Sequence, residues 1–111
     1  MASGFLLNIV ATECSPDCEE RFNKWYNEVH VPMLFKYTGL KRVTRYQLMG
    51  ETPGQAKYLA LYEFKDAAAL GGFQKSPEFG AAMEEMEGTW KGGGFDIKWM
   101  AVYQPIKTWE R

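Results

Sequence analysis

Residues 58–83 read YLALYEFKDAAALGGFQKSPEFGAAM, and this stretch decides the fold. Its first seven residues alternate in the two-residue period of a half-buried β-strand. Asp66 is placed to cap a short helical segment that follows the strand. Ser76 and Pro77 then predict the start of a second helix, which runs to about Glu87. The stretch therefore combines strand and helix in the way that an α+β domain requires.

Two strands and a helix precede this stretch. Residues 5–12 are apolar and partly β-branched and predict the first strand, and residues 41–49 predict the second. Between these strands, Ser15 and Pro16 are typical of a helix N-cap and a first helical position. We expect Pro32 to end or kink this helix near His30 and Val31, because the residue before a proline is pushed away from helical angles. The helix carries one apolar stripe, made of Phe22, Trp25, Tyr26, Val29 and Met33.

A last strand is predicted over residues 95–104, after a glycine run at 92–94. The element order is βαββαβ within a single domain, 1–111. This is the α+β, ferredoxin-like arrangement of a four-stranded antiparallel sheet with two helices on one face. The other face is left uncovered, and we expect it to pair with a second copy of the chain in a homodimer. Strict alternation in the last strand predicts one face with Phe95, Ile97, Trp99, Ala101 and Tyr103 and another with Asp96, Lys98, Met100 and Val102.

Composition limits the classes of partner. The chain has 111 residues, a net charge of -1 and a pI near 5.8, so it lacks the positive field that attracts nucleic acids or anionic membranes. Aromatic residues make up 15%, more than a small domain hides easily, which predicts an interface or a ligand pocket. Residues 1–10 have no signal-peptide pattern and no stretch has the length of a membrane span, so we expect a cytoplasmic location.

The cysteines and glycines do not predict a cofactor. Cys14 and Cys18 are four residues apart, and the chain has no further Cys or His pair to complete a metal site, so no metal is expected. The glycine run at 92–94 precedes a strand instead of a helix, which is the reverse of a phosphate-binding loop.

His30 is the only histidine and the main candidate for chemistry. At about 100° per residue, the helix places it at the border of the apolar stripe, beside Asn23 and Asn27. An imidazole titrates near neutral pH and can transfer protons without a cofactor. The helix end near Pro32 would stabilise its protonated form. The competing interpretation is a semi-buried histidine with a structural role only.

Two stretches resemble a known family. Residues 25–47, WYNEVHVPMLFKYTGLKRVTRYQ, resemble the W-Y-x-x-x-H-x-P element, glycine and strand of the EthD-like group in the dimeric α/β-barrel superfamily. Residues 58–83 resemble the strand, acidic cap, Phe and S-P-x-F helix start of the same group. The resemblance covers most of the chain and implies a dimeric α/β barrel with a pocket between the sheet and the helices of each subunit. It implies no single activity, because the superfamily hosts heme-degrading and cofactor-free monooxygenases, polyketide cyclases, dismutases and lyases.

The resemblance also narrows the site. Heme-degrading members use an Asn on the first strand together with a Trp and a His; Asn8 matches the first, but Phe73 and Met83 stand where the Trp and the His would be. In plant polyketide cyclases of this fold a histidine precedes the helix proline, and here that residue is Ser76. Chemistry should therefore centre on His30.

These observations predict a cofactor-independent enzyme that acts on a small aromatic or polyketide-like molecule, of cyclase, lyase, isomerase or oxygenase type. His30 would be the general acid/base, and Tyr62 and Tyr46 would supply hydroxyls that hold an oxyanion or carbonyl. The alternatives are a heme- or porphyrin-binding protein with His30 as axial ligand and a non-catalytic small-molecule-binding dimer. The residues expected to bind the substrate are Asn8, Trp25, Tyr26, Asn27, Phe73, Met83 and Trp99.

Overall fold

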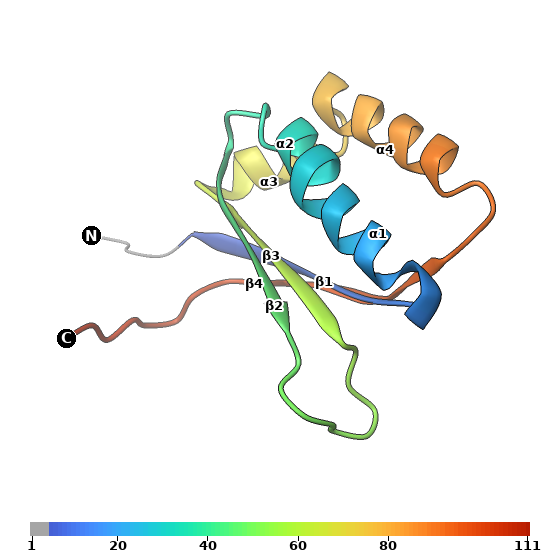
Figure 1. Ribbon diagram of the computed structural model, residues 1–111. Coiled ribbons are helices and arrows are strands. Elements are labelled where there is room, and N and C mark those ends of the chain that lie inside the picture. The colour runs from blue at the N-terminus through green and yellow to red at the C-terminus, as the bar shows by residue number, and fades with distance from the viewer. Residues whose placement is uncertain (1–4) are drawn as a thin grey trace.

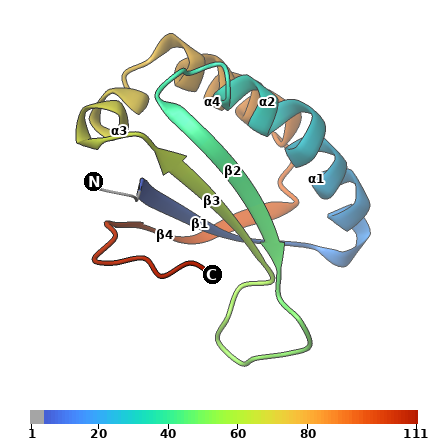
Figure 2. The ribbon, with the colours of Figure 1, turned by 90° about the vertical axis from the view of Figure 1, so that its left-hand side faces the viewer.

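A four-stranded antiparallel sheet with helices on one side forms the domain (Figures 1 and 2). The computed structural model describes residues 5–111, so the first four residues of the predicted domain lie outside the described residues. The strands lie in the order β2-β3-β1-β4, which confirms the α+β, ferredoxin-like fold. The elements are β1 (Leu6–Cys14), η1 (Pro16–Cys18), α1 (Glu19–Trp25), η2 (Tyr26–His30), α2 (Val31–Leu34), β2 (Leu40–Gln47), β3 (Tyr58–Phe64), α3 (Ala67–Phe73), α4 (Pro77–Thr89) and β4 (Phe95–Tyr103).

The core lies between the sheet and the helices. Strand β3 shows the predicted alternation. Its first, third, fifth and seventh residues are buried beneath the helices, whereas its two leucines are only partly buried. Phe22 of α1 and Phe64 of β3 are fully buried, and the Phe22 ring packs against Tyr26, Tyr58 and Phe95. The helix-facing residues of β3 are Tyr58, Ala60, Tyr62 and Phe64.

Two of the three predicted helix caps are present. The Asp66 carboxylate accepts a hydrogen bond from the Ala69 amide at 2.8 Å, and the Ser76 hydroxyl accepts one from the Phe79 amide at 3.1 Å. Ser15 does not cap its helix, because its backbone N–H and hydroxyl both point to the Gly94 carbonyl, at 2.9 and 3.4 Å. Ser15 therefore ties the end of β1 to the turn before β4.

The first helix does not end at Pro32. Instead it changes from α1 to the π-helical turn η2 and continues as α2 to Leu34. The Val31 amide donates to the Tyr26 carbonyl, five residues back, as in a π-helix. A proline cannot donate its amide and crowds the carbonyl of the preceding turn in a regular α-helix. The wider turn before Pro32 lets the helix continue, so the predicted end near His30 is wrong, and the irregularity expected there takes the form of a π-helical turn.

Strict alternation fails in β4 as well. The register with β1 shifts between Ala11 and Thr12, so that Trp99 is opposite Ala11 while Ile97 is opposite Thr12. The extra residue, Lys98, is a β-bulge, and a bulge reverses the side to which the following residues point. Met100 therefore lies on the helix side with Phe95 and Ile97, and Trp99, Ala101 and Tyr103 lie on the opposite side.

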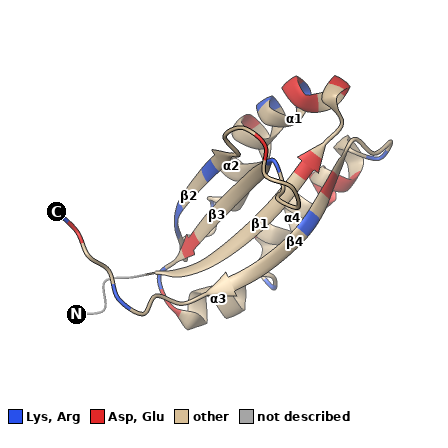
Figure 3. Ribbon diagram, turned by 90° about the horizontal axis from the view of Figure 1, so that it is seen from below, with Lys and Arg blue, Asp and Glu red and all other residues tan. Residues whose placement is uncertain are grey.

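The side of the sheet without helices carries few charged residues at its centre (Figure 3). Its charged residues lie toward the strand ends, where Arg42 forms a salt bridge with Glu63 at 2.7 Å and the acidic residues Glu13 and Asp96 are opposite each other in the strand register. We call this surface the open face. Its large exposed side chains include Tyr46, Trp99 and Tyr103.

Candidate functional site

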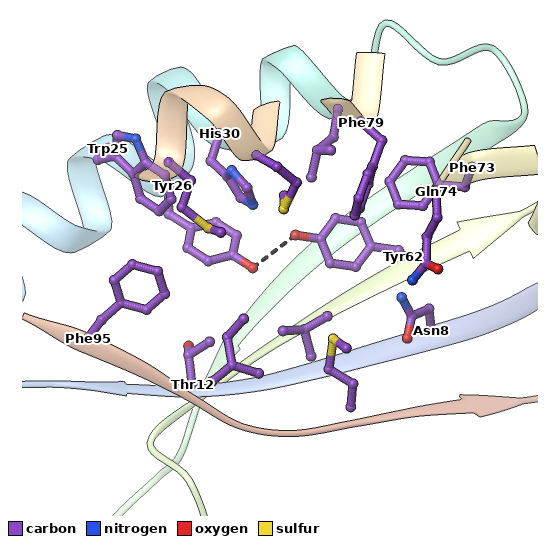
Figure 4. A pocket seen from close by; sticks show the side chains of 16 residues that line it. Asn8, Thr12, Trp25, Tyr26, His30, Tyr62, Phe73, Gln74, Phe79 and Phe95 are labelled. Carbon is purple, nitrogen blue, oxygen red and sulfur yellow. Dashed lines mark hydrogen bonds between the residues drawn. The ribbon is translucent and has the colours of Figure 1, made fainter. Parts of the chain in front are cut away.

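An apolar pocket lies between the helices and strands β1 and β4 (Figure 4). Its volume is about 150 Å³. The helices α1 to α4 roof the pocket and the helix-facing residues of β1, β3 and β4 form its floor. The lining residues are Asn8, Val10, Thr12, Trp25, Tyr26, His30, Leu34, Tyr62, Phe73, Gln74, Phe79, Met83, Met86, Phe95, Ile97 and Met100.

His30 lines this pocket and is 5% exposed. Its ring stacks on Trp25, with 4.6 Å between ring centroids, and meets the Tyr26 ring edge-on at 5.0 Å. The Nδ1 atom is buried and has no hydrogen-bond partner within residues 5–111. An unpaired buried nitrogen costs about 1–3 kcal/mol, so the fold keeps this imidazole at some expense in stability.

The π-helical turn explains why His30 is buried. Residues five apart in an α-helix point about 140° away from each other. The i→i+5 hydrogen bonding of η2 brings Trp25 and His30 onto one face, where their rings stack. The predicted border position, next to Asn23 and Asn27, assumed a regular α-helix and is therefore wrong.

Burial sets the protonation state of His30. Desolvation lowers its pKa from 6.5 to about 4, against an opposing effect of the Glu85 carboxylate and with a smaller lowering effect of Arg45. The expectation that the helix end would stabilise an imidazolium is thus wrong. At neutral pH the imidazole is uncharged and has one nitrogen able to accept a proton.

Two tyrosines lie beside His30. The Tyr26 and Tyr62 hydroxyls share a hydrogen bond of 2.9 Å, and both side chains are buried. Burial raises the pKa of Tyr26 and raises that of Tyr62 well above its ordinary value, so both phenols keep their protons at neutral pH. One proton is used within the pair, and the other is free to be donated to a ligand.

Arg45 lies behind Tyr26, outside the pocket. Its guanidinium stands 4.3 Å from the centroid of the Tyr26 ring and donates to the side-chain oxygens of Asn23 and Asn27, each at 2.9 Å. Asn27 is exposed and does not line the pocket, so its predicted substrate contact is wrong. Asn27 instead holds a cation against the outer side of the Tyr26 ring.

Glu85 fixes the other neighbour of His30. Its carboxylate accepts a hydrogen bond from the Trp25 Nε1 at 2.9 Å and a second one from the Thr89 hydroxyl. The bond from Trp25 to Glu85 connects α1 to α4 and fixes the indole plane on which His30 stacks.

The structure brings most predicted site residues together, except three. His30, Tyr62, Asn8, Trp25, Tyr26, Phe73 and Met83 all line the pocket. Tyr46 is 52% exposed and pairs with Leu59 on the open face, so its predicted catalytic position is wrong. Trp99 was predicted on the pocket side, and the bulge at Lys98 turns it to the open face.

Sequence reasoning missed several pocket residues. Gln74 caps the end of α3, and nothing in its sequence position indicates a role. Thr12 lies on the helix side of β1 at two-residue spacing from Asn8 and Val10, so alternation could have found it. Met100 could not be found, because a bulge leaves no clear trace in the sequence.

The described residues show neither a membrane helix nor a metal cluster. No helix within residues 5–111 is long and apolar enough to cross a bilayer. In the same range, no group of three His, Cys, Asp or Glu residues is arranged to hold a metal ion.

The fold and the pocket together define a ferredoxin-like α+β domain with an apolar cavity under its first helix. Within this class, the family described as "Domain of unknown function (DUF4286)" matches residues 5–93, and the chain belongs to that family. No curated protein is significantly similar to the chain.

Solved structures support the same fold. An EthD family protein from Bacillus halodurans superposes with a TM-score of 0.67 at 16% identity, covering 91% of this chain and 99% of its own. A DABB family protein with a ferredoxin-like fold from Mesorhizobium loti gives 0.65 at 16%, covering 95% and 100%. A mutant of MhuD with two manganese protoporphyrin IX molecules bound per active site gives 0.68 at 10%, covering 96% and 99%. These likenesses confirm the ferredoxin-like fold that the resemblance to the EthD-like group implies.

Proposed function

We propose that the protein is a cofactor-independent enzyme that binds a small aromatic or polyketide-like molecule in this pocket and transfers a proton through His30. The observation that carries the proposal is the buried, uncharged imidazole with an unpaired nitrogen, set beside the Tyr26–Tyr62 pair in an apolar cavity. Perturbed pKa values that coincide with a cavity are typical of functional sites.

The cavity limits the size of the ligand. An apolar cavity of about 150 Å³ holds one benzene ring, whereas pockets for drug-sized ligands have about 300–1,000 Å³. The part of the ligand that the cavity encloses is therefore a single ring or a short chain with few polar atoms, and a larger ligand would extend past Ile97 and Met100, which are 46% and 55% exposed.

The roles of the side chains follow from their states at neutral pH. Uncharged His30 accepts a proton from an acidic carbon or hydroxyl of the ligand. The free proton of the tyrosine pair is donated to the oxygen on which negative charge develops. That charge in turn stabilises the imidazolium, which returns the proton in the second half of the reaction.

Deuterium exchange tests this role without knowledge of the natural reaction. Phenylacetone has an acidic methylene between a ring and a carbonyl, and the enzyme should exchange its protons in D₂O, as followed by NMR. His30→Gln should lower the exchange rate by about 10²- to 10⁴-fold. The matched control is Tyr46→Phe, which removes a phenol on the open face and should leave the rate unchanged. Equal rates in wild type and His30→Gln would overturn the proton-transfer role.

Heme is the alternative ligand, and the pocket fits it only in part. An uncharged imidazole is the form that ligates iron, so the donor chemistry of His30 is suitable. The cavity volume of about 150 Å³ is too small, because a porphyrin is a large ligand and even drug-sized ligands occupy pockets of about 300–1,000 Å³. We therefore assign no step to heme. A hemin titration checks this: the absorption spectrum should be the same with wild type and His30→Ala.

We also propose that the open face is the interface of a homodimer. Tyr46, Trp99 and Tyr103 are 39–55% exposed there, and the centre of the face has few charges. A second copy has the same apolar surface and can cover it in a symmetric, self-complementary contact. Trp99→Glu should convert a dimer into a monomer in analytical ultracentrifugation, while Lys24→Glu on the exposed side of α1 should not. A wild-type monomer at micromolar concentration would overturn the interface.

A further inference from the structure

Two amide side chains lie at one end of the pocket, away from His30. Asn8 comes from β1 and Gln74 from the end of α3, and Figure 4 shows their amides pointing toward one another beyond the Tyr62 ring. Neither amide is hydrogen-bonded to another of the pocket side chains drawn there, among which Tyr26 and Tyr62 form the one marked bond. Gln74 is exposed and Asn8 is partly buried, so the two amides lie where the pocket opens to solvent.

The pocket also has no charged group for an anion. Among the described lining residues, none carries a charge at neutral pH, since His30 is unprotonated. Two charged groups near the His30 end are engaged elsewhere: Arg45 binds two asparagines behind Tyr26, and Glu85 binds Trp25 and Thr89. A carboxylate or phosphate that entered the cavity would lose its hydration without gaining a cation.

Strand geometry gives the length of the site. Asn8 and Thr12 both line the floor, four residues apart on β1, which corresponds to about 13 Å along the strand. A single ring spans about half of that distance. A ring placed under the tyrosine pair therefore reaches the amides with a substituent of one or two atoms.

We propose that Asn8 and Gln74 form the polar end of the pocket and select an uncharged aromatic ligand with a second carbonyl or hydroxyl oxygen, distinct from the oxygen at the tyrosine pair, which binds between the two amides. The inference rests on the proposed ligand-binding function and adds the class of ligand to it. An amide offers both donor and acceptor, so a ketone, an aldehyde, an amide or an un-ionised phenol can bind, and a carboxylate cannot bind well.

Three probes of nearly equal shape test this selection. Acetophenone has a carbonyl, α-methylstyrene has a CH₂ in its place, and benzoate has a carboxylate. Dissociation constants are measured by ligand-observed NMR at pH 7 with wild type and with the near-isosteric double variant Asn8→Leu, Gln74→Met. We expect acetophenone to bind wild type about tenfold more tightly than benzoate, because this end of the pocket offers neutral amides and the pocket lining has no cation.

The preference for a carbonyl is measured as the ratio of two dissociation constants, and this ratio is compared between wild type and the double variant. The Kd of α-methylstyrene divided by that of acetophenone should fall by about tenfold from wild type to the double variant, and the different hydrophobicity of the probes cancels. Gln104→Met, which removes an exposed amide after β4, should keep the wild-type ratio. Far-UV circular dichroism and α-methylstyrene binding show that the double variant is folded.

The outcomes separate this inference from the function on which it rests. An unchanged ratio in the double variant would overturn the role of the amides and leave the ligand-binding function standing. Benzoate binding as tight as acetophenone binding would overturn the selection of uncharged ligands. If none of the three probes binds wild type, the proposed function fails together with the inference.

Discussion

The two faces of the sheet carry similar aromatic side chains and differ in what covers them. On the helix side, Tyr58, Tyr62 and Phe64 are at most 4% exposed. On the open face, Tyr46, Trp99 and Tyr103 are exposed by about half or slightly less. One chain therefore completes only one core. The pocket is thus complete within one chain, whereas the open face is the surface for which we propose a second copy as the cover.

The two faces also differ in how much their polar groups lose contact with water. Polar groups on the open face contact solvent, as the Arg42–Glu63 pair does. On the covered face, His30 and the tyrosine pair are removed from water, and their pKa values are shifted by burial. Only the covered face can therefore hold an imidazole whose protonation is set by the protein instead of by the solvent.

The largest predicted effect compares one residue from each face. Phe22→Ala removes a fully buried ring and should lower the free energy of unfolding by about 3–5 kcal/mol at any protein concentration. Tyr103→Ala should cost less than about 1 kcal/mol at nanomolar concentration, and more as the concentration rises and the dimer forms. Urea unfolding at two concentrations measures both. A loss of unfolding free energy in Tyr103→Ala that is large and independent of protein concentration would contradict the proposal that the open face is covered only in a dimer.

Most of the fold could be predicted from sequence because its signals are local. The alternation of residues 58–64, the cap at Asp66 and the Ser76-Pro77 helix start each depend on a few neighbouring residues, and the structure confirms each of them. Together with the order of elements, these signals define the sheet topology.

Two of the errors, on the position of His30 and on the pocket side of β4, share one physical origin, which is a local change of period. The π-helical turn buries His30, and the bulge at Lys98 exchanges Trp99 for Met100 in the pocket. The π-helical turn and the bulge each insert one extra residue into a regular element, so that the side chains after the insertion point to a different side. The site could be predicted in part from every element except β4, since predicted residues of β1, the first helix, β3, α3 and α4 line the pocket. The contributions of β4 and of Gln74 depend on tertiary contacts that no local pattern encodes.

A smaller effect concerns the pH dependence of stability. The folded protein holds the pKa of His30 at about 4, below the 6.5 of an unfolded histidine, so the unfolded state binds more protons between these values. Stability should therefore fall as the pH falls from 6.5 toward 4, by about 2 kcal/mol between pH 7 and pH 5. Since the chain has no other histidine, His30→Leu should lose most of this dependence, as measured by urea unfolding at the two pH values. The same pH dependence in both proteins would show that His30 is not buried as described.

The smallest predicted effect asks whether His30 serves stability or function. Replacing it with leucine at pH 7.5 removes the unpaired Nδ1, whose burial costs about 1–3 kcal/mol, and loses the stacking on Trp25, which contributes about 0.5–1.5 kcal/mol. The first effect is the larger, so His30→Leu should raise the free energy of unfolding by about 1 kcal/mol while it abolishes deuterium exchange. His30→Gln keeps a polar group in the same place and should not be stabilised. A leucine variant that is less stable than wild type would mean that the imidazole stabilises the fold, and the burial of His30 would then be explained by packing alone.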